Sequence, residues 1–371
     1  MKSLRVSLVL SVACTFSGSG PIGAAAQSAF EIERQGALGQ VAWVEQAYAE
    51  RLGPRGAAWR ARVEKDEATL LTSVEWFIRN AEGDQALRLA VPLAYFWSYE
   101  GRPEESRGLL MRVLALPSAA APTAVRAKAL SDAGLLAFQE RDQPTSRALN
   151  EESLRIYRRL QDKSGMATAL VGLSRVALRD LDYPAVRRYA EESAVLRRDL
   201  GDKPGQAVAV HMLAAVSRMQ GQYAKAAELY QFCLDANREA GYDVSVAGEL
   251  FDLGYVRLRQ GDVAAARGLF TESLEKYREL QDEAGIAYDL TGFAAIAVEQ
   301  KQPTRAARLY GAALAILDQF SITFDPDDQL EVDHYTAKAL GLISPDAFEA
   351  ASAEGHTTSP ERAVALALGA P

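Results

Sequence analysis

Hydrophobic and polar residues follow a pattern that repeats every 40 positions between residues 125 and 313. One column of the repeat is large and apolar, at Leu149, Tyr189, Leu229, Leu269 and Leu309. Another column is small, at Gly134, Ser174, Ala214, Gly254 and Ala294. Small residues let two helix backbones approach closely, and large residues at helical spacing fill the seam between them. The pattern therefore predicts helical hairpins that bury their apolar faces only against neighbouring hairpins.

Polar loops recur with the same period and mark the places where the predicted helices begin. Asp142-Gln143-Pro144 has counterparts at residues 182–184, 222–224, 262–264 and 302–304. A proline is tolerated in the first turn of a helix, because the N–H that it lacks would be unpaired there anyway. We therefore predict an all-α fold, a right-handed α-solenoid of antiparallel helix pairs.

The repeat divides the chain into four segments. We expect a signal peptide over residues 1–26 and a helical N-terminal cap over residues 27–84. The repeat array, with about six helix pairs, is expected over residues 85–320. A helical C-terminal cap and tail follow over residues 321–371, because the period fails after the last hairpin.

The N-terminal segment has the features of an export signal. Lys2 and Arg5 give it a basic start, the stretch from residue 4 to 16 is mostly apolar, and Ala24-Ala25-Ala26 offers small residues for cleavage. The apolar stretch is shorter than the roughly 20 residues that a membrane span needs, so we expect no stable membrane insertion. These features predict a periplasmic or secreted protein. The alternative is a wrongly assigned start in front of a cytoplasmic protein.

The columns resemble those of the tetratricopeptide repeat, in a form longer than the usual 34 residues. More narrowly, residues 40–368 resemble the C-terminal repeat region of ATP-dependent transcriptional regulators of the maltose-regulator type. Three stretches carry this likeness: residues 62–76, residues 305–313 and residues 348–365. The chain contains no Gly-x-x-x-x-Gly-Lys-[Ser/Thr] motif, so the nucleotide-driven switching of those regulators does not carry over.

Composition and residue spacing give no support to catalysis. A formal net charge of −8 argues against broad attraction to nucleic acid. The three histidines, His211, His334 and His356, share no metal-ligand spacing, and Cys233 occupies a column of small residues. We therefore expect no cofactor, no metal and no enzymatic activity. The acidic run from Asp325 to Glu331 lacks the ligand pattern of a calcium loop and is interpreted as the acidic start of a helix.

The predicted site is the groove of the array. In tetratricopeptide arrays the first helix of each hairpin lines the concave face. Offsets from the small column then place seven residues in the groove: Arg175, Arg179, His211, Arg218, Phe251, Tyr255 and Arg259. The planar guanidinium suits carboxylate recognition, although arginine stems also commonly cover apolar surface.

Two functions are consistent with such a groove. The first is a non-enzymatic scaffold that binds a peptide or protein partner, acidic in character because of the arginines. The alternative is a sensory arm of a cytoplasmic regulator, separated from its ATPase, that binds a small inducer or a partner regulator.

Overall fold

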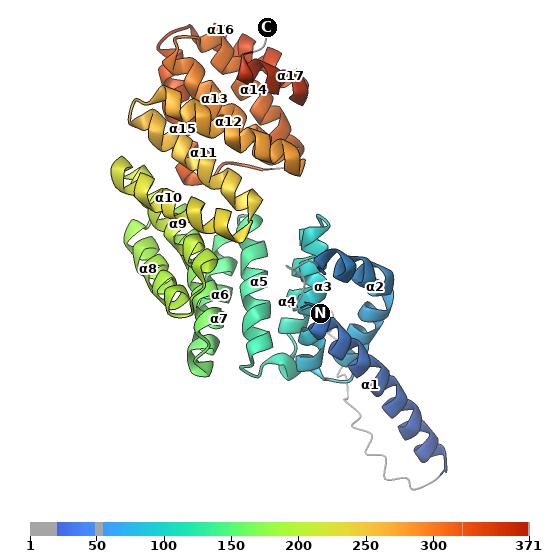
Figure 1. Ribbon diagram of the computed structural model, residues 1–371. Helices are drawn as coiled ribbons and strands as arrows, with labels where there is room; N and C mark the ends of the chain where they lie inside the picture. Colours follow the sequence, from blue (N-terminus) through green and yellow to red (C-terminus); the bar gives the residue numbers. More distant parts are fainter. Residues whose placement is uncertain (1–20, 49–54, 321, 370–371) are drawn as a thin grey trace, which may run out of the picture. The chain divides into compact units, whose positions relative to one another are not determined.

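The computed structural model describes residues 21–48, 55–320 and 322–369, and within these ranges all regular structure is helical. The predicted all-α solenoid is confirmed. The chain separates into two compact units, residues 1–121 and 122–371 (Figure 1). This division lies later than the expected start of the array at residue 85. The first hairpin therefore belongs to the N-terminal unit.

The N-terminal unit contains α1 (Pro21–Tyr48), α2 (Gly56–Arg79), α3 (Gly83–Tyr99), α4 (Pro103–Leu114) and the short 3-10 helix η1 (Pro117–Ala119). α3 packs against the other three α-helices of the unit. The buried Trp59 ring lies 5.7 Å from Tyr95 and 6.4 Å from Phe96, centroid to centroid. Residues 1–20 of the predicted signal peptide lie outside the described residues. The backbone is helical from Pro21 through the expected cleavage position at Ala26.

The second unit contains five antiparallel helix pairs and three further helices. The pairs are α5 (Ala124–Gln139) with α6 (Gln143–Leu160), α7 (Lys163–Arg179) with α8 (Tyr183–Asp199), α9 (Lys203–Met219) with α10 (Tyr223–Ala240), α11 (Asp243–Arg259) with α12 (Val263–Leu280), and α13 (Glu283–Glu299) with α14 (Pro303–Gln319). α15 (Pro326–Leu340), α16 (Pro345–His356) and α17 (Pro360–Leu368) follow. The first helices of neighbouring pairs also contact one another, as α5 does α7 and α7 does α9, and we call α5, α7, α9, α11 and α13 the first-helix layer.

The turn inside each pair uses the same backbone device. A residue with positive φ, such as Arg141, Leu181 or Gly261, ends the first helix. The next residue is often an aspartate whose carboxylate accepts the N–H of the third residue beyond, as Asp142 and Asp182 do. A left-handed residue followed by a side-chain cap satisfies the unpaired groups at both helix ends. This explains why the polar loops recur with the period of the repeat.

The small columns permit close helix contacts. A Cβ atom added to Gly254 would lie 2.5 Å from the Phe270 ring, so only glycine fits at this position of α11. In another small column, Ser153, Ser193, Cys233 and Ser273 each donate a hydrogen bond to the backbone carbonyl 26 residues earlier. Small side chains therefore both admit the neighbouring helix and bond to it.

The C-terminal segment returns to the middle of the array. α15 packs against α13 and α14 and also against α9. Asp327 and Asp328 lie in its first turn, at the helix start that the acidic run predicts. α16 packs on α14, and α17 packs on α13 and α14. The first turn of α15 is thereby brought beside residues that precede it by more than one hundred positions.

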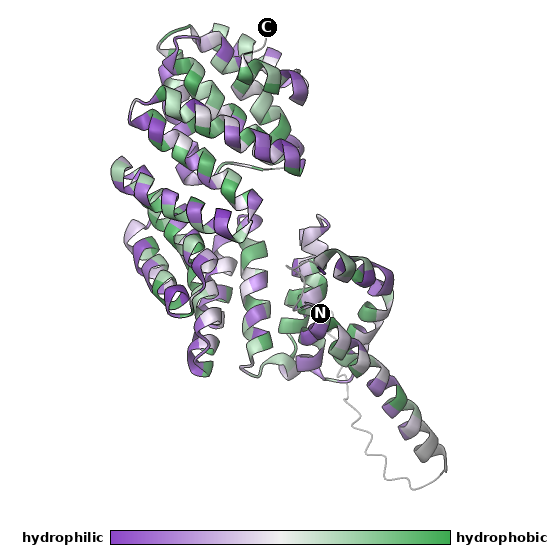
Figure 2. Ribbon diagram, in the orientation of Figure 1, coloured by the Kyte–Doolittle hydropathy of each residue, from purple (hydrophilic) through white to green (hydrophobic). Residues whose placement is uncertain are grey.

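Hydrophobic and hydrophilic residues alternate along the helices of both units, as expected for amphipathic elements (Figure 2). Among the described helices, none combines the length and the apolar character that a membrane span requires.

Candidate functional site

The first-helix layer of the second unit carries a cavity of about 390 Å³. Its walls come from α7, α9 and α11, and the segment Asp325–Asp328 closes one side. Aromatic rings of Phe138, Phe251 and Tyr288 contribute to the lining. A smaller cavity of about 220 Å³ continues toward α5 and shares Phe138, Arg175 and Val208 with the first. A concave, partly aromatic space with a few polar groups is the usual form of a ligand site.

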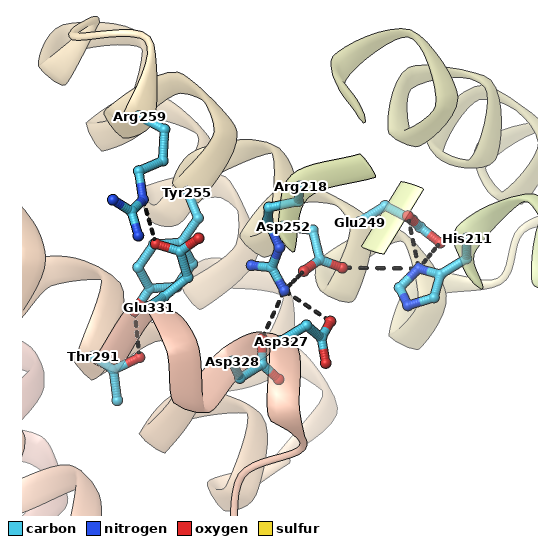
Figure 3. A network of polar contacts seen from close by, with 10 residues as sticks. All are labelled: His211, Arg218, Glu249, Asp252, Tyr255, Arg259, Thr291, Asp327, Asp328 and Glu331. Atoms are coloured by element: carbon cyan, nitrogen blue, oxygen red, sulfur yellow. Dashed lines mark hydrogen bonds and ion pairs between the residues drawn. The ribbon is translucent and has the colours of Figure 1, made fainter. Parts of the chain in front are cut away.

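Arg218 of α9 contacts three carboxylates that line this cavity (Figure 3). They belong to Asp252, Asp327 and Asp328, and we call them the acidic side of the cavity. The Nη2 atom of Arg218 donates to Asp327 at 2.8 Å and to Asp328 at 3.1 Å, and it lies 3.3 Å from Asp252. The side chain is only 1% exposed, and it does not line the cavity. Arg218 therefore contacts the carboxylates from the protein interior, whereas Asp252, Asp327 and Asp328 line the cavity.

His211 of α9 forms the next contact of the same network. Its Nδ1 atom lies 3.2 Å from both carboxylate oxygens of Glu249 and 3.8 Å from Asp252. Burial disfavours the imidazolium, but the charge and hydrogen bond of Glu249 outweigh burial and raise the pKa of His211 to about 10. His211 is therefore cationic at neutral pH and forms an ion pair with Glu249.

Two further arginines of the first-helix layer pair with the C-terminal segment. Arg179 donates from Nε to Asp325 at 2.8 Å, and its guanidinium stacks over the Phe138 ring. Arg259 donates from Nε to the buried Glu331 at 2.8 Å. The carboxylates that these arginines contact are thus supplied by the chain itself.

Arg175 of α7 differs from the other three arginines. Its side chain lines both cavities and makes no hydrogen bond or ion pair with any residue that the structure describes. Burial lowers the pKa of Arg175, with Asp325 opposing that shift. Loss of water without a compensating partner is costly for a guanidinium. Arg175 is therefore the cation of this site that can accept a carboxylate from outside the chain.

The predicted groove residues fall into two groups. Arg175, Arg179, His211 and Phe251 line the cavity. Arg218, Tyr255 and Arg259 do not: Tyr255 is 1% exposed, its ring lies 5.3 Å from Phe270, and its hydroxyl lies 2.8 Å from Thr291 Oγ1. The expectation that all seven line one open groove therefore differs from the structure, because α15 covers the part of the layer around Arg218 and Arg259.

Sequence reasoning missed several residues of the site. Glu249 occupies a column that holds alanine at 129, 169 and 209. Asn237 of α10 stands where other units have Tyr157, Arg197 and Tyr277. Both line the cavity, and the smaller Asn237 leaves room that a tyrosine would fill. The sequence did contain a sign of the site, because each of these two residues differs in polarity or size from the residues at the equivalent positions of other repeats.

Burial, together with neighbouring carboxylates, raises the pKa of two of these aspartates. Burial, against the opposing charge of Arg218, raises the pKa of Asp252 to about 7. Burial and the adjacent Asp327 raise the pKa of Asp328. One guanidinium among three carboxylates leaves a formal charge of −2 when all are ionised. Proton uptake relieves this charge because like charges in a poorly hydrated site disfavour each other's ionisation.

Two groups in this region have the spacing of metal ligands. They are His211 with Glu249 and Asp252, and Asp252 with Asp327 and Asp328. In the first group, the protonated imidazole would have to give up its proton before it could bind a metal. In the second group, the Arg218 guanidinium already contacts all three carboxylates. Each set thus already contains a cation of the chain itself, His211 in the first and Arg218 at the second, and we assign no metal to them.

Cys233 is completely buried and donates to the carbonyl of Ala207 at 3.3 Å. Burial raises the pKa of its thiol. A thiol that is both inaccessible and protonated is a poor nucleophile.

Comparison with known proteins identifies the fold. No protein-family model matches the chain, and no curated protein does. Among solved structures, a Rap protein complexed with competence and sporulation factor is similar with a TM-score of 0.59, at 11% identity, over 87% of this chain and 85% of that one. The Rap conjugation gene regulator of plasmid pLS20, in complex with the Phr* peptide, has a TM-score of 0.50 at 11% identity, over 89% and 96% of the two chains.

The apo form of RapI has a TM-score of 0.50 at 10% identity and covers 69% of this chain and 97% of its own. These likenesses confirm a tetratricopeptide-type helical repeat. At such low identity they concern the fold alone. The narrower resemblance to maltose-type regulators stays a resemblance of sequence motifs.

Proposed function

We propose that this chain is a non-enzymatic binding module that takes a peptide segment of a partner into the cavity of the first-helix layer. The observation that carries the proposal is Arg175, a guanidinium that lines both cavities and has no partner among the described residues. A carboxylate of the peptide, either its C-terminus or an acidic side chain, would pair with this guanidinium in the bidentate geometry that arginine favours.

The remaining lining suits a peptide backbone and apolar side chains. Asn237 is 4% exposed and its amide makes no hydrogen bond within the described residues, so it can pair with both a backbone N–H and a carbonyl. Phe138, Phe251 and Tyr288 offer apolar surface. The pLS20 regulator, which shares the fold, has been solved in complex with a peptide. This supports the ligand class by analogy of fold.

The ligand is less acidic than the count of groove arginines predicts. Arg179, Arg218 and Arg259 are already neutralised by Asp325, Asp252, Asp327, Asp328 and Glu331. A strongly acidic peptide would meet one unpaired guanidinium and several carboxylates. We therefore restrict the acidic requirement to one carboxylate at Arg175.

A library of short synthetic peptides tests this function. The immobilised protein is exposed to one library with free C-terminal carboxylates and to the same library in amidated form. We expect selective capture by the wild type and loss of that capture in Arg175→Gln. Arg155→Gln, which changes an exposed arginine on α6, is the matched control and should bind as the wild type does.

Capture that is equal in Arg175→Gln and the wild type would refute the assignment, provided that circular dichroism shows both to be folded. Failure of the wild type to select any peptide would refute peptide binding itself.

A small-molecule ligand is the second candidate. The cavity volume lies in the range of small-molecule sites, and the segment Asp325–Asp328 limits the length of chain that the cavity can hold. A screen of small organic acids by thermal shift distinguishes the two. Stabilisation of the wild type but not of Arg175→Gln, in the absence of peptide capture, would favour the sensory function over the scaffold.

Export of the protein is a separate proposal, based on the basic start and the small residues before Gln27. Intact-mass measurement of the protein from its native host should give a chain that begins at Gln27. A cytosolic chain that begins at Met1 would contradict export.

A further inference from the structure

The acidic side of the cavity holds more carboxyl groups than it has cations of the chain to pair with them. Figure 3 shows Arg218 reaching Asp252, Asp327 and Asp328 through one nitrogen, Nη2. The neighbouring pairs, His211 with Glu249 and Arg179 with Asp325, are each balanced. The surplus therefore belongs to the three aspartates, which line the cavity while Arg218 lies behind them.

Arg175 adds a positive charge to another part of the cavity lining. It comes from α7, whereas Asp252 comes from α11 and Asp327 and Asp328 from the first turn of α15. The cavity thus presents one unpaired cation and, separately, a group of under-neutralised carboxylates. Asn237, buried and without a side-chain partner among the described residues, lines the same space. An unpartnered buried amide points to a polar ligand in this cavity.

We propose that Asp252, Asp327 and Asp328 form a subsite for a cationic group of the ligand, an ammonium or a guanidinium, so that the bound peptide segment is bipolar. The inference rests on the proposed function, since it concerns the same cavity. The ligand's cation lies at the aspartates and its carboxylate at Arg175, which also fixes the direction in which the segment lies across the first-helix layer.

A ligand cation would take over the role that a proton has in the free protein. With the subsite empty, the raised pKa values of Asp252 and Asp328 favour uptake of protons. A bound ammonium or guanidinium stabilises the ionised carboxylates and expels those protons. Binding should therefore release protons near neutral pH, and the affinity should rise as the pH rises through about 7.

The experiment uses the peptides that the wild type captures from the library, each prepared in four forms. One form is unchanged, one has its N-terminus acetylated, one has Lys and Arg replaced by Gln, and one combines both changes. We expect affinity to fall about tenfold or more when the cation that occupies the subsite is removed. Acetylation and Gln replacement identify that cation as the terminal ammonium or a side chain.

The variant Asp327→Asn keeps the size of the side chain and removes one of the three carboxylates. It should weaken the preference for the cationic form of the peptide, whereas the preference for a free peptide carboxylate over an amide should persist. Asp318→Asn, an exposed change on α14, is the matched control and should leave both preferences intact. Calorimetry of the wild type in two buffers of different ionisation enthalpy should show proton release, and this measurement needs no variant.

Three outcomes would overturn the subsite. The captured peptides could bind equally well in all four forms. Binding could proceed without proton release. Millimolar Ca²⁺ or Mg²⁺ could stabilise the wild type but not Asp327→Asn, which would assign the aspartates to a metal ion. In each case capture that still depends on Arg175 would leave the proposed function standing.

Discussion

The helix pair α7–α8 and the region from α9 to α11 are built from the same repeat but differ in what they bury. The first buries Val171, Ala169 and Leu178 at its inner columns. Forty residues later, His211 and Arg218 stand in the columns of Val171 and Leu178, and Glu249 extends the column of Ala169 and Ala209. At these three columns, apolar contacts in the first region are replaced by ion pairs in the second.

This replacement does not serve stability. Buried ion pairs are often no more stabilising than apolar residues of similar size, because the loss of hydration offsets their attraction. The network is also incomplete, since Arg218 Nε and Nη1 and the Tyr230 hydroxyl lack hydrogen-bond partners in the described part of the chain. Polar groups kept at such a cost, beside a cavity, support the proposed binding role. We therefore place the proposed function where polar residues interrupt the apolar columns.

Restoring a column residue should break the network and give the largest effect. Arg218→Leu introduces the residue that the array carries at Leu178 and Leu258. We nevertheless expect it to lower the free energy of unfolding by about 3–5 kcal/mol, because two buried carboxylates and the half-buried Asp328 lose their partner. Urea unfolding followed by circular dichroism measures this. Arg155→Leu, on the exposed face of α6, should change stability by less than about 0.5 kcal/mol.

A substitution in the apolar part of the array should have a smaller effect of purely steric origin. Gly254→Leu places its side chain against the Phe270 ring, and overpacking of this kind costs about 1–3 kcal/mol. Gly268→Leu is the matched control, because a Cβ at Gly268 meets no atom within 4 Å. Equal melting temperatures for the two variants would show that the register of the small column is wrong.

The ionisable groups buried in the region from α9 to α11 should make the stability of the protein depend on pH. His211 and Asp252 have folded-state pKa values of about 10 and about 7, both above their usual ranges. The folded state therefore holds more protons than the unfolded state. The stabilisation from Asp252 is lost as the pH rises through about 7, and that from His211 is lost between about 6.5 and 10. The melting temperature should fall as the pH rises from 6 to 9.

A double variant tests the cause of this fall. His211→Val with Glu249→Ala restores the residues that the earlier columns carry, and it should flatten the decline above pH 6.5. Asp289 and Asp328 also have raised pKa values, so they contribute to a fall of stability with rising pH in both the wild type and the double variant. An unchanged decline in the double variant would contradict the charged state assigned to His211.

Cys233→Ser should have the smallest effect. The hydroxyl would replace the thiol that donates to Ala207, as the neighbouring units already do with Ser193 and Ser273. We expect a change below about 0.5 kcal/mol in urea unfolding. The sequence holds a second cysteine, Cys14, so labelling is followed by peptide mapping at Cys233. The Cys233 thiol should resist a thiol reagent until the protein unfolds, and its rapid labelling would contradict its burial.

The fold could be predicted from the sequence because its determinants are local and repeated. The glycine and alanine columns, the aspartate caps and the prolines each act within one hairpin or between neighbours. The same reasoning found the groove arginines and the acidic run from Asp325 to Glu331. It could not join them, because Arg179 and Asp325 are 146 residues apart, and no periodic pattern reports a contact of that span.

The cavity was missed for a related reason. Asn237 and Glu249 look unremarkable as single residues, and their meaning lies in what their columns hold elsewhere. A search for polar or undersized residues in otherwise apolar columns would have pointed to α9, α10 and α11. It would not have shown that Arg175 alone lacks a carboxylate, since that depends on where α15 packs.

A double-mutant cycle between Arg175 and the ligand carboxylate tests whether this guanidinium receives the ligand. One captured peptide is prepared in two forms, with its carboxylate free and with that carboxylate amidated, whether it is the C-terminus or an acidic side chain. The Kd of each form is then measured for the wild type and for Arg175→Gln. We predict a coupling energy of about 1.5–3 kcal/mol, as for a hydrogen bond to a charged group. A coupling energy near zero, with tight binding retained by the folded variant, would show that Arg175 does not receive the ligand.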